Sequence, residues 1–332
     1  MTGWRAMQLT FAVMAVMAGL AAAQQGAPPS SPDRESLDEA WWTGPMLAPS
    51  AATLPQRHFL IEPYLYDVIT QGQYDRNGVR RNAPHANGFG WLTYMLYGLT
   101  DKLTVGLIPT AGFNTVSGGM SSTRVGLGDL TLQAQYRLRQ FHERSWLPTI
   151  SFAVQEALPT GKYDRLGDRP TDGFGSGAFT TTLALYSQTY FWLPNGRILR
   201  MRFNLSQAFS SNVKIEGASV YATAGGFRGN SKPGKSFFVD AAWEYSLTQR
   251  WVLALDATCH YVDNTRVSGY NIRYPDLPGT LDSGASNAFG LAPAIEYNWS
   301  SKLGVLIGAR LIPVGRNTAA TITPAVAINF VH

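Results

Sequence analysis

The chain has 332 residues and a net charge of +5, and it is 45% hydrophobic but only 15% charged. Soluble domains typically carry about 25% charged residues, while a mean hydropathy of −0.09 excludes a bundle of membrane helices. No cluster of Lys and Arg follows one segment, so nucleic acid is not an expected partner. A membrane β-barrel explains both averages, because its strands alternate apolar and polar residues.

Residues 1–23 have the pattern of a secretory signal peptide. Arg5 supplies a positive charge, Leu9 to Leu20 is an apolar run, and Ala21-Ala22-Ala23 is a small-residue cleavage site. The apolar run is too short to span a bilayer, which takes about 20 residues. We therefore expect the mature protein to begin at Gln24.

Residues 24–56 are rich in Pro, Ser and Ala and show no periodicity. They form the second predicted region, a periplasmic N-terminal segment with a pair of tryptophans at Trp41 and Trp42. Two arrangements are open. The segment packs on the periplasmic rim of the barrel, or it folds into the lumen. We favour the rim.

From residue 57 to residue 332 the chain reads as strands that alternate apolar and polar residues. In residues 199–206, for example, Leu, Met, Phe and Leu alternate with Arg, Arg, Asn and Ser. The predicted fold is all-β, a transmembrane antiparallel β-barrel of the outer-membrane type with about twelve strands. The strands are expected at 57–69, 88–99, 103–112, 126–138, 148–158, 177–192, 198–209, 235–247, 251–264, 287–299, 302–313 and 318–331.

The connections between these strands alternate between short and long, with the 314–317 connection as the exception. Outer-membrane barrels have short periplasmic turns and long extracellular loops. The pattern therefore predicts both termini in the periplasm and the long loops outside the cell.

The polar face of each strand is expected to line the lumen, because a Lys or Arg at the lipid midplane costs about 2–4 kcal/mol. Asp67 and Glu156 are exceptions that we expect at the outer rim. The arginines and carboxylates of the lumen set are nearly balanced, so they either line a narrow aqueous path or rigidify a filled barrel. We favour the path, with these lining residues: Glu62, Arg137, Arg200, Arg202, Asp240, Glu244, Asp256, His260, Glu296 and Arg310.

Catalysis is the weakest interpretation of the lumen. His260 with Asp256 is the one pair that could serve an enzyme acting on membrane lipid, and a lumen hydrogen bond is the simpler role for it. Sequence patterns for a nucleophile elbow, a zinc-binding histidine pair or a phosphate loop do not occur. We therefore expect no enzyme, no catalytic residues, no metal and no cofactor. Cys259 is the sole cysteine, so no disulfide forms within the chain.

The residues also resemble a known family. Trp42-Thr43-Gly44-Pro45, Gly126-Leu127-Gly128-Asp129 and Leu158-Pro159-Thr160-Gly161-Lys162 are similar to segments of the MetA-pathway of phenol degradation family. The resemblance implies an outer-membrane transporter that moves small, often aromatic or apolar, compounds.

We therefore expect a porin-like channel in the outer membrane of a Gram-negative bacterium, for passive uptake of small organic compounds. The expected partners are outer-membrane lipid and lipopolysaccharide, the outer-membrane assembly machinery and a small-molecule substrate. The alternative function is a non-conducting structural or adhesive barrel that acts through its extracellular loops.

Overall fold

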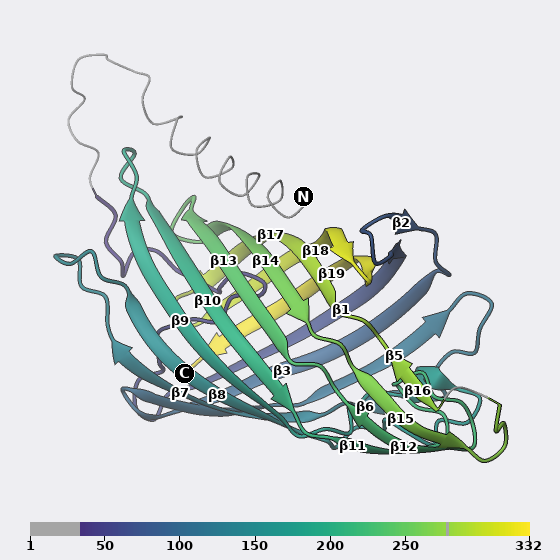
Figure 1. Cartoon of the computed structure of the whole chain (residues 1–332). Coiled ribbons are helices and arrows are strands. Elements are labelled where there is room, and N and C mark those ends of the chain that lie inside the picture. Colours follow the sequence, from purple (N-terminus) through teal and green to yellow (C-terminus); the bar gives the residue numbers. More distant parts are fainter. Residues whose placement is uncertain (1–33, 277–278) are drawn as a thin grey trace.

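The computed structural model describes residues 34–276 and 279–332, so the predicted signal peptide lies outside the described residues. In the described ranges, twelve wall strands form a closed antiparallel barrel (Figure 1). The barrel closes because β1 (Phe59–Tyr74) pairs on one side with β3 (Ala86–Thr100) and on the other with β19 (Thr318–Val331). The predicted fold class is confirmed.

The other wall strands follow one another around the barrel in chain order. One of them is divided at Pro109 into β4 (Leu103–Ile108) and β5 (Thr110–Val116), because proline has no N–H for the ladder. No helix in the described ranges is long and apolar enough to cross a membrane. The remaining wall strands are β7 (Leu130–Arg139), β8 (Thr149–Leu158), β9 (Thr180–Trp192), β10 (Ile198–Ser210), β13 (Ser236–Ser246), β14 (Trp251–Val262), β17 (Ser286–Ser300) and β18 (Leu303–Arg316).

Side chains alternate between the two faces of the wall as the sequence predicts. On β10, Arg200 and Arg202 are 7% and 6% exposed, whereas Phe203, which lies between Arg202 and Asn204, is 50% exposed. On β14, Asp256 is fully buried and its neighbour Leu255 points outward. The apolar face is therefore the outer surface of the barrel, and the polar face surrounds the lumen.

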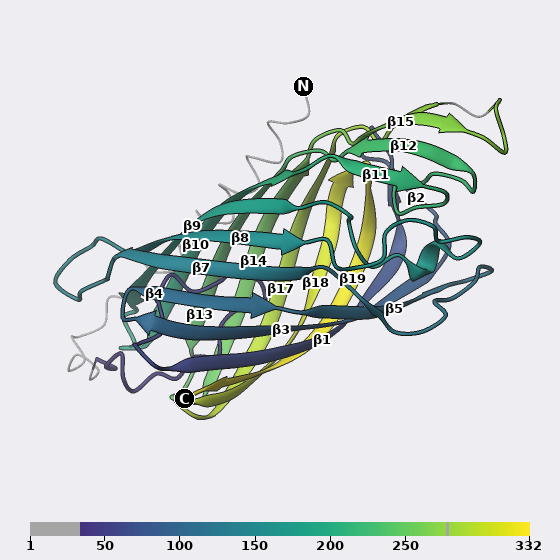
Figure 2. The same ribbon diagram turned by 90° about the horizontal axis from the view of Figure 1, so that it is seen from below.

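The connections gather at two different ends of the barrel. The short-turn end holds the turns at 101–102, 140–148, 193–197, 247–250 and 301–302. The long-loop end holds 75–85, 117–129, 159–179, 211–235 and 263–285, with Asn317 alone between β18 and β19. Figure 2 shows the long connections beyond one end.

Several short elements at the long-loop end are absent from the sequence prediction. Two long connections form a separate four-stranded sheet of β11 (Val213–Glu216), β12 (Phe227–Lys232), β15 (Arg266–Asn271) and β16 (Thr280–Asp282). The others are β2 (Arg80–Arg81) and the single-turn helix η1 (Pro170–Asp172). These elements are too short for their periodicity to separate them from loop sequence. The predicted strand 126–138 is divided into β6 (Gly126–Leu127) and β7.

An arginine on the outer face tests the assignment of that face to lipid. Leu255→Arg lies near the middle of β14 and should lower the free energy of unfolding by about 2–4 kcal/mol in lipid vesicles. Leu138→Arg, at the end of β7 beside a short turn, should cost about 0–1 kcal/mol. Urea titration, followed by the shift in gel mobility on heating, measures both. Equal costs would contradict the assignment.

Candidate functional site: the barrel lumen

Residues 41–54 cross the lumen in the short-turn half of the barrel. Their backbone groups hydrogen-bond to inward side chains of β4, β7, β8, β10, β14 and β17. The Ser50 hydroxyl donates to Gln188 of β9. The expectation that this segment packs on the rim is therefore wrong for residues 41–54. An extended, proline-containing segment leaves its N–H and C=O groups free, and the inward polar side chains satisfy them.

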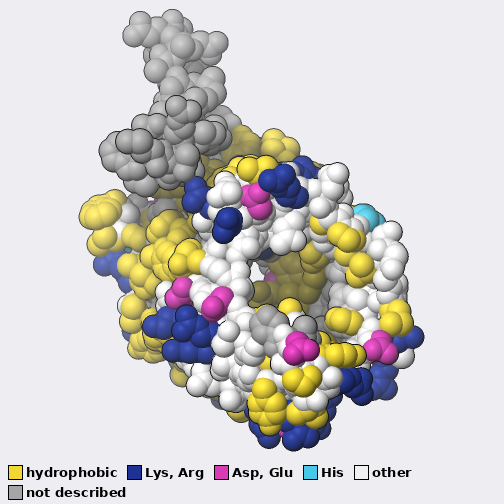
Figure 3. Space-filling model, turned by 45° about the vertical axis from the view of Figure 1, so that its right-hand side comes forward, with side chains coloured by type: hydrophobic (Ala, Val, Ile, Leu, Met, Phe, Trp, Pro, Cys, Tyr) yellow, Lys and Arg dark blue, Asp and Glu magenta, His cyan; other side chains and the backbone are white. Residues whose placement is uncertain are grey.

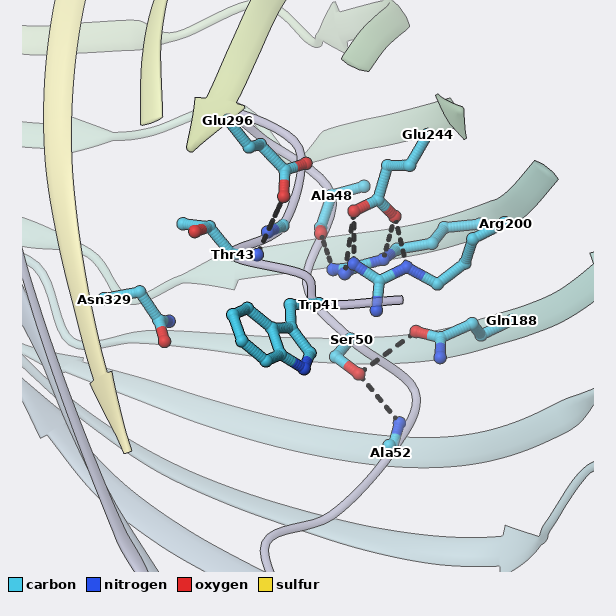
Figure 4. A network of polar contacts seen from close by, with 12 residues as sticks. Trp41, Thr43, Ala48, Ser50, Ala52, Gln188, Arg200, Glu244, Glu296 and Asn329 are labelled. Carbon is cyan, nitrogen blue, oxygen red and sulfur yellow. Dashed lines mark hydrogen bonds and ion pairs between the residues drawn. The ribbon is translucent and has the colours of Figure 1, made fainter. Parts of the chain in front are cut away.

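Two buried carboxylates hold the first part of this segment. Glu296 accepts hydrogen bonds from the N–H groups of Thr43 (2.7 Å) and Gly44 (3.1 Å), the first of which is drawn in Figure 4. Asp256 accepts from the N–H groups of Met46 and Ala48, both at 3.0 Å. These hydrogen bonds hold residues 43–48 against β14 and β17.

Two arginines bind the segment from β10 (Figure 4). Both pair with Glu244, with 2.7 Å between Arg200 Nε and Glu244 Oε2 and 3.0 Å between Arg202 Nε and the same oxygen. Arg202 Nη1 also donates to the carbonyl oxygen of Ala48 (2.7 Å), and the Arg200 guanidinium lies 4.4 Å from the centre of the Trp42 ring. The ion pairs expected inside the lumen are present, and the arginine of each pair also contacts the segment.

Neutral side chains hold the rest of the segment. Asn204 Nδ2 donates to the Pro49 carbonyl (2.9 Å), Gln135 Nε2 to the Ser50 carbonyl (3.0 Å), and the Leu54 N–H donates to Thr104 (2.9 Å). These residues are absent from the predicted lining set, which consists of charged side chains and one histidine. Their inward position in the alternation was a signal that could have identified them.

The other predicted lumen residues are not brought into this network. Asp240 is fully buried, and in the described chain both its carboxylate oxygens lack a hydrogen-bond partner. Arg310 reaches Thr258 at 3.5 Å, and Glu62 accepts from Asn329 (3.1 Å). Arg137 is half-buried near the short-turn end. His260 packs edge-on against Phe238, with ring centres 5.8 Å apart.

Two cavities follow one another along β1 and β3. The larger, about 540 Å³, lies toward the long-loop end and is lined by Tyr66 and Val68 of β1. The smaller, about 240 Å³, lies toward the short-turn end and is lined by Glu62 and Tyr64. Because these positions alternate along one strand, the cavities are adjacent. In Figure 3 a hollow opens into the barrel, with hydrophobic side chains inside it.

A cluster of aromatic and apolar side chains, called the tyrosine constriction below, lies where the two cavities adjoin. The rings of Tyr64 and Tyr94 meet edge to face, with centres 6.0 Å apart. Met46 of the crossing segment packs in the same cluster, with Leu47, Tyr66 and Leu92 beside it. The segment therefore packs against this cluster, on the side that faces β1 and β3.

The 159–179 connection folds over the larger cavity and is fixed in place by polar contacts. Asn114 of β5 donates to the carbonyl oxygen of Thr171 (3.0 Å). Thr123 donates to both carboxylate oxygens of Asp172, through its N–H (2.7 Å) and its hydroxyl (2.6 Å). These hydrogen bonds from the Thr123 side chain and backbone lower the pKa of Asp172 below its usual value.

The closed twelve-strand barrel is that of a bacterial outer-membrane protein. Residues 73–323 match the MetA-pathway of phenol degradation family. The chain belongs to this family, as its sequence motifs suggested.

Solved outer-membrane barrels share the fold. An outer-membrane channel from Pseudomonas putida F1 superposes with a TM-score of 0.66 at 14% identity, covering 86% of this chain and 100% of that one. The TodX deltaS2S3 mutant, a monoaromatic hydrocarbon channel, gives 0.42 at 12% identity over 92% and 99% of the two chains. The NanC porin gives 0.42 at 9% identity over 81% and 98%. No curated protein matches the chain in sequence.

Asp256→Asn tests whether the carboxylate holds the crossing segment. The amide keeps one acceptor oxygen in place of two, so at least one N–H of residues 46–48 loses its partner, at a cost of about 1–3 kcal/mol. Hydrogen exchange of a peptide covering 41–54 should become faster. Asp240→Asn is the matched control, because Asp240 is equally buried and does not contact the segment. The same exchange rate in both variants would contradict this role.

Acid should release the 159–179 connection. The pKa of Asp172 is lowered in the folded protein. Its contribution to the stability of the connection is therefore present above the unfolded pKa of about 3.9, and it is lost as pH falls through the lower folded value. A spin label at Asp168→Cys in a Cys259→Ser background should become more mobile below that pH. Asp172→Ala should make it mobile at neutral pH, and Asp276→Ala should not. If neither acid nor Asp172→Ala changes the mobility of the label, Asp172 does not hold the connection in place.

Proposed function

We propose that the protein is a passive channel for small organic molecules across the outer membrane. The observation that carries this proposal is the pair of adjacent cavities along β1 and β3, which together reach from the long-loop half to the short-turn half. A barrel with a purely structural role has no need of such a pair. The family name and the fold shared with the Pseudomonas putida channel are consistent with it.

The path follows one side of the lumen. On the opposite side, residues 43–48 fill the space against Asp256 and Glu296, and Arg200 and Arg202 pair with Glu244. Of the ten predicted lining residues, Glu62, Arg200 and Arg202 line the smaller cavity. The others rather support the wall and the crossing segment. In this proposal the long-loop end faces outside, where lipopolysaccharide lies, and the assembly machinery inserts the barrel.

The chemistry of the path limits its cargo. A solute passes neutral and apolar groups in the larger cavity, then the tyrosine constriction, then the smaller cavity, whose lining includes both signs of charge. The narrow tyrosine region favours small solutes, and the apolar surroundings favour solutes that give up water easily. Small, mainly apolar organic compounds meet both conditions.

Conductance in planar bilayers tests the channel. The wild-type protein should give discrete conductance steps, and Tyr94→Ala should enlarge them because it removes a ring from the constriction. Tyr297→Ala is the control, since this tyrosine lies on the outer face and contacts Trp251 and Trp299. Absence of steps, together with no solute-dependent swelling of liposomes, would overturn the proposal.

A second candidate function is a non-conducting barrel that acts through its loops. The separate sheet of β11, β12, β15 and β16 favours it, because ordered loops at one end offer a fixed surface. Deleting residues 265–284 would remove β15 and β16 without shortening a wall strand. Under this function the deletion abolishes adhesion of cells, whereas a channel keeps its conductance steps.

A further inference from the structure

The four-stranded sheet at the long-loop end has one buried and one exposed face. Val213, Ile215 and Phe227 pack together on the buried face, with Tyr163 of the 159–179 connection beside them. Because that connection folds over the larger cavity of the lumen, the opposite face of the sheet points away from the barrel axis. Figure 1 shows β11, β12 and β15 beyond the ends of β10, β13 and β14. The exposed face therefore lies just past the wall.

Basic side chains outnumber carboxylates on this exposed face. Both carboxylates are already paired, Glu216 with Lys214 and Arg165, and Asp282 with Arg266. The face as a whole therefore carries a positive charge that the sheet does not neutralise. Its basic residues are Lys214, Arg228, Lys232 and Arg266, and its carboxylates are Glu216 and Asp282.

Two of the basic residues are directly opposite each other in the sheet. Lys232 of β12 pairs in register with Arg266 of β15. Like charges in such a pair destabilise a sheet, because their Cβ atoms are only about 4.5–5.5 Å apart. Arg266 reaches Asp282 on its other side, but within the described ranges the side chains of Lys232 and Arg228 have no hydrogen bond or ion pair. An anion above these side chains would relieve the repulsion.

The basic face borders the lipid-facing surface of the wall. Below it the wall strands end in exposed, outward aromatic rings, Phe209 of β10, Phe237 of β13 and Tyr261 of β14. Lys235 Nζ lies 5.6 Å from the centre of the Phe209 ring, so positive charge begins where the apolar surface ends. Asp263 lies opposite Lys235, but in the described chain the two form no ion pair. Aromatic rings in this position are typical of the level of lipid headgroups.

We propose that the exposed face of this sheet binds the phosphate groups of lipid A, the phosphorylated glycolipid that anchors lipopolysaccharide. The acyl chains lie against the wall beside Phe209 and Phe237, and the phosphates accept charge-assisted hydrogen bonds from Arg228 and Lys232. The apolar border favours a lipid over a soluble anion, because only a lipid uses both surfaces at once.

The proposal rests on the orientation in the proposed function, with the long-loop end outside the cell. It adds a specific site to the general contact of a barrel with its membrane. It also assigns a task to the four-stranded sheet that neither conduction nor adhesion requires, since the sheet holds lipid of the membrane in which the barrel lies.

Binding of bisphosphorylated lipid A to the barrel in detergent, followed by native mass spectrometry, tests the site. Arg228→Gln combined with Lys232→Gln should weaken binding about tenfold or more and leave the fold intact, because neither side chain has a partner in the described ranges. Arg76→Gln combined with Arg124→Gln is the matched control. It removes the same charge from exposed loop positions outside the sheet and should bind as the wild type does. Equal weakening by both pairs would overturn the site.

Two further probes test the ligand class. Lipid A without phosphates keeps the acyl chains, and inorganic phosphate keeps the anion. Both should bind more weakly than bisphosphorylated lipid A, whose binding should also weaken in 0.5 M salt, a concentration of about the order that screens exposed charges. Equal binding of the dephosphorylated lipid would overturn the role of phosphate. Displacement of lipid A by an equal concentration of inorganic phosphate would overturn the lipid as the ligand.

The outcome also separates this proposal from the channel function. Arg228→Gln with Lys232→Gln should leave the conductance steps unchanged, because both residues lie outside the two cavities. Conductance steps with unweakened lipid A binding in this variant would overturn the site and leave the channel intact. Lipid A binding that the variant weakens, in a barrel without conductance steps, would support the site and overturn the channel.

Discussion

The pairing of β1 with β19 closes the sheet, and the rest of the structure depends on this contact. In hydrocarbon an unpaired backbone group costs several kcal/mol, so a spanning sheet must have no free edge. Closure also separates the two faces completely. Apolar side chains meet lipid on the outside, and the inside becomes an enclosed space where charged groups such as Glu244 and Arg200 can satisfy each other.

The enclosed space is used unevenly. On the side of β10, β14 and β17, buried charges and the segment 41–54 fill it with hydrogen bonds. On the side of β1 and β3, the two cavities leave it open. A barrel of twelve strands is too wide for side chains alone to fill and narrower than the porins with about 16–18 strands. The segment 41–54, which is not part of the wall, fills part of this lumen and leaves the rest open.

The wall strands could be predicted from sequence because their signal is local. Alternation along β10 and β14 identified the strands, the faces and the inward positions of Arg200, Arg202 and Asp256. The partners of those residues could not be predicted in the same way. Asp256 and Glu296 bind backbone N–H groups more than 200 residues away in sequence, and backbone groups carry no sequence signature.

The crossing segment has a consequence for how the molecule forms. Residues 41–54 come first in the chain among the described lumen groups, yet their partners lie on seven wall strands that end with β17. A sheet shorter than the run from β4 to β17 lacks part of that set of groups. The segment is synthesised before these strands, but it can make its full set of hydrogen bonds only after they have paired.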